Sequence, residues 1–233
     1  MSTTTPGTRP PAWITVSLIL MTASLLLYTL APTTGRIPNG QSEPPRLSET
    51  LPNIRIVTDR PDVPGYRRDQ FGAGWGPARA GNSTCTTREM MVSKALPGAL
   101  VLRDCTIKAT KGLDPYSGGI MATRSPERKQ RIEVDHIYPL AAAWDMGASE
   151  WDPSVRVRFA NDPLNLVVVT AVENRAKSDA LPATWLPTDR WARCWYVRRI
   201  AAVAQAYALP LTVDDAVKMR RQCLLERLNG ILR

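Results

Sequence analysis

The sequence of 233 residues contains a single histidine, four cysteines and no extended block of lysine or arginine. Because no two cysteines form a C-x-x-C pair, the spacing gives little support to a cysteine zinc site. Without a basic block there is no cationic tail, and no internal repeat is present. The chain has 44% hydrophobic and 22% charged residues, which excludes a wholly disordered or fibrous protein.

The chain is basic along its whole length. Thirty lysines and arginines against 21 aspartates and glutamates give a net charge of +9. A polyanionic partner, either nucleic acid or an acidic membrane surface, is therefore favoured over a cationic one. The length fits one sizeable domain or two small ones.

An uncharged segment, residues 12–31, follows a short polar flank at residues 1–11. At ~1.5 Å per residue its twenty residues are long enough to cross a hydrocarbon layer of ~30 Å. The apolar stretch is longer than in most cleaved signal peptides, which favours an uncleaved transmembrane signal-anchor. A cleaved signal peptide is the main alternative and a buried soluble helix the lesser one. Either export signal places the rest of the chain outside the cytoplasm, anchored in the membrane or secreted.

The cysteines agree with export. An even number in an exported chain predicts two disulfides, for which three connectivities are possible. The two local pairings, Cys85 with Cys105 and Cys194 with Cys223, are favoured, and unpaired buried thiols are the alternative.

Five prolines punctuate residues 32–52, which are expected to form a linker, and the folded body is expected over residues 53–233. Apolar patterning predicts an α+β body. Strands are expected at 54–57, 100–102, 106–107, 131–137 and 166–169, an ordered glycine-rich loop at 65–76, and helices at 87–96, 139–146, from 152, at 171–179, 188–208 and 212–229.

The last two helices are expected to begin at the threonine caps Thr188 and Thr212. Pro210 marks the turn of an antiparallel helical hairpin, which would bring Cys194 and Cys223 together. This is an independent reason for pairing them.

Chemistry-bearing residues follow one another in a distinctive order. Asp135 and His136 end a predicted strand, Asn165 begins a second strand, and Asn174 lies on the following short helix. Histidine can accept a proton near neutral pH, and an aspartate oxygen suits Mg²⁺. Such groups could serve phosphodiester cleavage, which needs a nucleophile and a means of neutralising charge on the phosphate.

This order resembles the HNH (ββα-metal) nucleases. It is most similar to the family typified by the C-terminal domain of the GmrSD restriction endonucleases, in its secreted actinobacterial form. The motifs DHIYPL, FANDPLNL and ENRAKSD carry the resemblance, and GYRRDQFG with Trp75, CTTRE, LDPYSGG, TWLP and the last two cysteines extend it over about residues 54–225.

The resemblance implies a role for each motif residue. His136 would be the general base that activates water, and Asp135 and Asn174 would bind one divalent metal ion. Asn165 would hold the loop and orient the histidine, with Asn161 as its rival for that role. Because an amide oxygen is a hard ligand, Asn174 favours Mg²⁺ or Mn²⁺ over zinc.

Basic residues near these motifs are candidates for phosphate binding. Arg175 and Lys177 would flank the scissile phosphate. A cluster ahead of the catalytic strand would bind backbone further out, although a solvated loop is an equal alternative: Arg124, Arg128, Lys129 and Arg131.

The sequence therefore predicts an α+β body with an HNH core and a C-terminal helical hairpin. Its expected activity is metal-dependent endonucleolytic hydrolysis of DNA, or of RNA, with low sequence specificity. No protein partner is implied. The alternative is a catalytically inactive, membrane-tethered protein that binds nucleic acid or the cell envelope.

Overall fold

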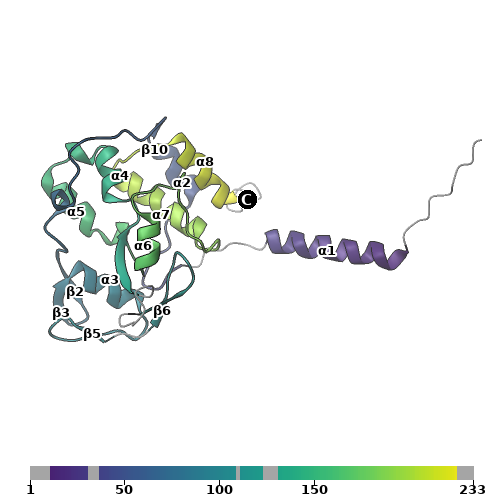
Figure 1. The fold of residues 1–233 in the computed structure, drawn as a ribbon, viewed down its shortest axis with the longest axis horizontal. Helices are drawn as coiled ribbons and strands as arrows, with labels where there is room; N and C mark the ends of the chain where they lie inside the picture. The colour runs from purple at the N-terminus through teal and green to yellow at the C-terminus, as the bar shows by residue number, and fades with distance from the viewer. Residues whose placement is uncertain (1–10, 31–36, 109–110, 123–130, 225–233) are drawn as a thin grey trace, which may run out of the picture. The chain divides into compact units, whose positions relative to one another are not determined.

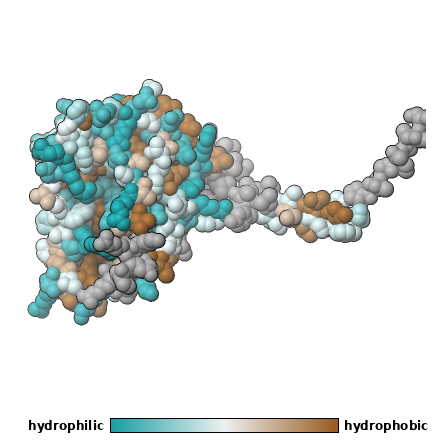
Figure 2. Space-filling view, viewed as in Figure 1, coloured by the Kyte–Doolittle hydropathy of each residue, from teal (hydrophilic) through white to brown (hydrophobic). Residues whose placement is uncertain are grey.

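The computed structural model describes residues 11–30, 37–108, 111–122 and 131–224, and its chain divides into two compact units, Met1–Thr33 and Thr34–Arg233. The first unit contains helix α1 (Ala12–Leu30). Apolar side chains such as Trp13, Leu18 and Met21 are exposed on this helix. Figure 2 shows hydrophobic residues at the surface of the helix. Among the described residues, no helix has the length and hydropathy that crossing a membrane requires.

The second unit is a mixed α+β body (Figure 1). Its helices are α2 (Leu47–Thr50), α3 (Thr87–Ala95), α4 (Leu140–Asp145), α5 (Pro153–Asn161), α6 (Ala171–Lys177), α7 (Arg193–Ala206) and α8 (Val213–Gln222). Short 3-10 turns are η1 (Leu51–Asn53), η2 (Arg68–Phe71), η4 (Ala148–Glu150) and η5 (Pro163–Asn165). The strands are β1 (Ile56–Val57), β2 (Pro77–Ala80), β3 (Ser83–Thr86), β4 (Leu100–Val101), β5 (Ile107–Lys108), β6 (Lys111–Leu113), β7 (Ile120–Ala122), β8 (Ile132–His136), β9 (Leu166–Thr170) and β10 (Leu211–Thr212).

Within the described residues the strands form two-stranded pairs, and the central pair is β8 with β9. These strands are antiparallel, and His136 lies opposite Leu166. Side chains alternate between the two faces of a strand, and both faces of this pair are buried. Burial on both sides explains why the sequence of β9, LVVVT, is continuously apolar.

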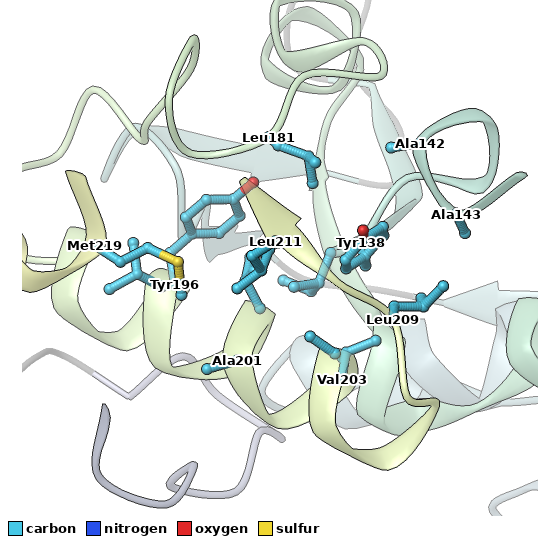
Figure 3. Packing of buried hydrophobic residues seen from close by; sticks show 14 of the residues in the cluster. Tyr138, Ala142, Ala143, Leu181, Tyr196, Ala201, Val203, Leu209, Leu211 and Met219 are labelled. Atoms are coloured by element: carbon cyan, nitrogen blue, oxygen red, sulfur yellow. The ribbon is translucent and has the colours of Figure 1, made fainter. Parts of the chain in front are cut away.

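Two hydrophobic clusters cover the two faces of this pair. One contains Val167 and Val169 with most of α7, and the other contains Leu166 and Val168 with much of α3. Figure 3 shows part of the first cluster, where residues of α7 and α8 gather around Leu211 of β10. The strand pair is thus packed between two hydrophobic clusters, which hold the end of β8 where Asp135 and His136 lie.

Several expectations are confirmed. The strands predicted at 131–137 and 166–169, the helix predicted at 171–179 and the helical hairpin all form, although residues beyond 224 lie outside the described part. Both locally paired disulfides, Cys85–Cys105 and Cys194–Cys223, are present.

The predicted start of the first hairpin helix is wrong. The helix α7 begins at Arg193, and the Thr188 hydroxyl donates instead to the carbonyl of Tyr116, 3.2 Å away. Asp189 belongs to the same loop, and its backbone N–H also donates to the carbonyl of Tyr116. Thr212, by contrast, caps α8 as expected, accepting a bond from Asp215.

The predicted boundary between linker and body, at residues 52 and 53, is also wrong, because the folded body begins earlier in the sequence. Leu47 and Leu51 are buried in the first cluster, and α2 packs against α7. The Gln41 amide donates to the carbonyl of Leu166, and Arg198 pairs with Glu43 at 3.3 Å. Proline-rich composition predicted a tether here, but the isolated leucines supply enough apolar surface to hold residues 41–52 on the body.

Candidate functional site

A cleft of about 470 Å³ opens where β8 ends. It brings together the C-terminal end of β8, the residues that follow it, helix α6 with its C-terminal turn, and the start of the glycine-rich loop, including the first residue of η2. Its lining consists of Tyr66, Arg68, Asp135, His136, Pro139, Leu140, Ala141, Asn174, Arg175, Ser178 and Asp179. Three of the four motif residues predicted from the sequence, Asp135, His136 and Asn174, therefore share one cavity.

His136 is only 5% exposed, and its ring orientation is fixed by two contacts. The Nε2 atom lies 2.9 Å from the carbonyl oxygen of Ala160, and the ring stacks on Trp75 with centroids 5.6 Å apart. A carbonyl oxygen can only accept, so in the neutral ring Nε2 carries the proton and Nδ1 keeps its lone pair. Burial lowers the pKa of His136 to about 3, which keeps the imidazole neutral at physiological pH, although the Ala160 carbonyl opposes this shift.

Asp135 and His136 are adjacent in β8, so their side chains leave opposite faces of the strand, and Asp135 is part of a buried network. The ammonium of Lys177 lies 2.9 Å from Oδ2 of Asp135 and 2.8 Å from the carbonyl of His136. The hydroxyl of Tyr116 also donates to Oδ2 of Asp135, at 2.8 Å. Burial raises the pKa of Asp135 above its ordinary value, and the Lys177 ammonium opposes that shift.

The position of Lys177 contradicts its predicted role as a phosphate ligand. Its side chain is fully buried and its charge is balanced by Asp135. Residues three apart share a helix face, so Lys177 lies on the same face of α6 as Asn174, whereas Arg175 is exposed. Helical periodicity alone is enough to place the two basic residues on different faces.

Asn165 is fully buried and fixes the loop that follows β8. Its Oδ1 accepts from the backbone N–H of Tyr138 at 2.7 Å, and its Nδ2 donates to the Tyr138 carbonyl at 3.1 Å. Among the described residues, the side chain of Asn165 hydrogen-bonds to the backbone of Tyr138 in this loop, and the imidazole of His136 bonds to the Ala160 carbonyl instead. Its rival Asn161 has a different task, since its Oδ1 accepts from the backbone N–H of Gly76 at 2.7 Å.

Asn174 is held by Glu133, a residue that the sequence motifs did not reveal. Its Nδ2 donates to Oε2 of Glu133 at 2.7 Å. Because the Nδ2 side of the Asn174 amide faces the Glu133 carboxylate, the Oδ1 atom of Asn174 points away from Glu133 and does not take part in this bond. A signal for this contact exists in the sequence, since Glu133 is two residues before Asp135 and therefore on the same face of β8.

The basic residues divide into three groups. Arg175 lines the cleft, together with Arg68, which the sequence motifs did not single out. Arg131 instead borders a separate cavity of about 310 Å³, next to Arg88. The three other residues of the predicted cluster lie outside the described residues: Arg124, Arg128 and Lys129.

The donor set can be compared with the predicted metal. Among the described residues, no group of three His, Cys, Asp or Glu side chains is close enough to hold an ion. The predicted ligands, the Asp135 carboxylate and the Asn174 amide, both line the cleft and suit Mg²⁺ or Mn²⁺ in kind when water or phosphate completes the shell. A further carboxylate of the lining, Asp179, pairs with Arg60. An ion bound there would share Asp135 with the Lys177 ammonium.

Comparisons with known proteins identify the family to which the chain is similar. Residues 109–222 match the family described as the C-terminal domain of GmrSD restriction endonucleases. An uncharacterized secreted protein of Arthroderma benhamiae is 32% identical over 201 residues, covering 84% of this chain and 91% of its own length. No solved structure matches the chain. The matched region spans β8, β9 and α6 and so includes every residue that the cleft takes from these elements.

Proposed function

Since this chain belongs to the family of GmrSD restriction endonuclease C-terminal domains, we propose that it is an exported, metal-dependent endonuclease that hydrolyses phosphodiester bonds. The observation that carries the proposal is the shared cleft, which collects Asp135, His136 and Asn174 from two elements. Two antiparallel strands followed directly by a helix, β8, β9 and α6, support a ββα-metal core at this position.

The residues of the cleft have distinct tasks in this proposal. Nδ1 of His136 takes the proton of the attacking water, because Nε2 is occupied by the Ala160 carbonyl. Trp75 and the Ala160 bond hold the imidazole in one orientation. The exposed guanidinium of Arg175 binds a phosphate next to the scissile one.

Asp135 and Asn174 are the proposed holders of one divalent ion. When bound, Mg²⁺ or Mn²⁺ would supply a Lewis acid that neutralises charge on the phosphate and on the leaving oxygen. Glu133 keeps the Asn174 carbonyl oxygen free for this contact, and Asn165 fixes the loop after β8. DNA is the favoured substrate and RNA the alternative.

The proposed location is outside the cytoplasm. Two disulfides require an oxidising compartment to form and persist, and the similar protein of Arthroderma benhamiae is described as secreted. The apolar helix α1 is the export signal in this proposal.

A nuclease assay tests the proposal directly. Supercoiled plasmid, single-stranded DNA and RNA are incubated with the protein and Mg²⁺ or Mn²⁺, with and without EDTA. We expect EDTA to abolish cleavage and His136→Ala to lower the rate ~10²–10⁴-fold, the usual contribution of a positioned base. Asn174→Ala should raise the metal concentration needed for half-maximal rate.

The matched control is Asn53→Ala, since Asn53 is exposed and its side chain donates to the Glu49 carbonyl, away from the cleft lining. Equal cleavage by wild type and His136→Ala would refute the proposal.

One observation favours a second candidate, an inactive binding protein. The ammonium of Lys177 already balances the charge of Asp135 without any metal ion. In that case the protein would bind nucleic acid in the presence of EDTA and cleave none of the three substrates with either metal.

A further inference from the structure

We propose that Tyr66 and Arg68 form a nucleotide-binding subsite of the cleft, where one base stacks on the tyrosine ring and its phosphate contacts the guanidinium. The cleft would therefore take single-stranded nucleic acid in preference to a duplex. This inference rests on the nuclease function proposed above and adds the class of substrate.

The segment that carries these two residues is fixed to the body. Phe71 is buried and its ring lies 6.2 Å from that of Phe159. Nε of Arg156, on α5, donates to the backbone carbonyl of Gln70 at 3.1 Å. The subsite is thus attached to a rigid scaffold, as a binding site requires.

The ring of Tyr66 is anchored yet accessible. Its neighbours Phe71 and Trp144 both lie 6.3 Å away between ring centroids, at interplanar angles of 58° and 63°, so neither is stacked in parallel on it. Tyr66 is 36% exposed and lines the cleft beside Arg68. A half-fixed aromatic ring at the edge of a basic cleft is the platform on which single-stranded nucleic acids stack their bases.

The ion pairs of the described residues show which basic side chains of the cleft are available to bind a phosphate. Lys177 pairs with Asp135. Asp179, which also lines the cleft, pairs at 2.8 Å with Arg60, and Arg60 pairs at 2.7 Å with Asp145 as well. Arg68 and Arg175 are exposed and form no ion pair with any residue that the structure describes. Arg68 and Arg175 are therefore the lining side chains whose positive charge is available to a phosphate.

The preference for a single strand follows from the stacking contact. A base that stacks on Tyr66 must leave the stack of its own helix, which costs a few kcal/mol in a duplex and least in an unpaired strand. The same subsite would accept any base, because every base offers an aromatic face.

The test measures binding without hydrolysis. The full chain in EDTA is titrated into a fluorescent single-stranded 12-mer and into its duplex, and affinity is read by anisotropy over a range of NaCl concentrations. The variants are Tyr66→Leu, which keeps apolar bulk but removes the aromatic face, Tyr66→Phe, Arg68→Gln and, as a charge-matched control, Arg220→Gln on an exposed position of α8. Thermal unfolding monitored by circular dichroism verifies that each variant is folded.

We expect Tyr66→Leu to weaken single-strand binding about 5- to 150-fold, the effect of losing one base–aromatic stack, while Tyr66→Phe binds like the wild type. Arg68→Gln should reduce the slope of log K against log salt by about 0.7, the value for one phosphate contact on a single strand, and Arg220→Gln should not.

The outcomes separate this inference from the nuclease proposal. Tight single-strand binding that Tyr66→Leu and Arg68→Gln leave unchanged would overturn the subsite while the nuclease proposal stands. Duplex binding that is as tight as single-strand binding, and as sensitive to Tyr66→Leu, would overturn the strand preference. A wild type that neither binds nor cleaves any nucleic acid would overturn the nuclease proposal itself.

Discussion

The buried pair of Lys177 and Asp135 offers the sharpest test of the site geometry. In Lys177→Met the methionine retains apolar bulk, but Asp135 loses the cation 2.9 Å from its carboxylate and keeps the Tyr116 hydroxyl. Removing one partner of a buried ion pair costs ~3–5 kcal/mol, because the remaining charge is left uncompensated. This is a large part of the ~5–15 kcal/mol that stabilises a typical domain.

The stability of Lys177→Met should depend on pH, and the burial of Asp135 determines whether it rises or falls as the pH increases. Burial raises its pKa, and in the variant the ammonium no longer opposes the shift. Between the unfolded pKa of ~3.9 and the raised folded value, the folded variant holds one proton more than the unfolded chain. Its stability is therefore greatest below the unfolded pKa and falls by up to ~1.4 kcal/mol per unit as the pH rises through this range.

Urea unfolding followed by tryptophan fluorescence, in EDTA at pH 5 and pH 8, measures both effects. The control is Lys108→Met, since Lys108 is exposed on β5. In the double variant, Asp135→Asn with Lys177→Met, the unpaired charge is gone, so it should recover part of the loss at pH 8. If Lys177→Met unfolds within ~0.5 kcal/mol of the wild type at pH 8, the Lys177 ammonium does not hold Asp135.

Three further outcomes are expected. Asn165→Ala should lower the free energy of unfolding by ~2–4 kcal/mol in urea titrations, because the buried N–H and C=O of Tyr138 both lose their side-chain partner; an unchanged midpoint would contradict the loop-fixing role. Replacing Cys194 and Cys223 by alanine should cost ~3–4 kcal/mol, the chain-entropy value for a loop of 29 residues, measured by the same titration under non-reducing conditions against the disulfide-bonded wild type. Removing divalent ions with EDTA should stop cleavage while leaving the far-ultraviolet circular dichroism unchanged, since Lys177 supports the site without metal; a collapse of the spectrum would assign the metal a structural role.

The order of strand, strand and helix that carries the motifs could be predicted from the sequence. The apolar run of β9 and the alternation of β8 are local patterns, so both strands and α6 could be predicted. The disulfides followed from cysteine spacing and the helical hairpin, and Thr212 was a correct cap because its contact partner is only three residues away.

The contacts of the polar side chains depend on tertiary packing and could not be predicted from the sequence. The bonds from Lys177 to Asp135 and from the Gly76 N–H to Asn161 join residues 42 and 85 positions apart, which no local pattern encodes. Likewise the proline-rich composition of residues 41–52 predicted a tether, although Leu47 and Leu51 find a partner surface on α7. Periodicity shows which face a residue occupies, whereas the identity of its neighbour depends on how distant elements pack.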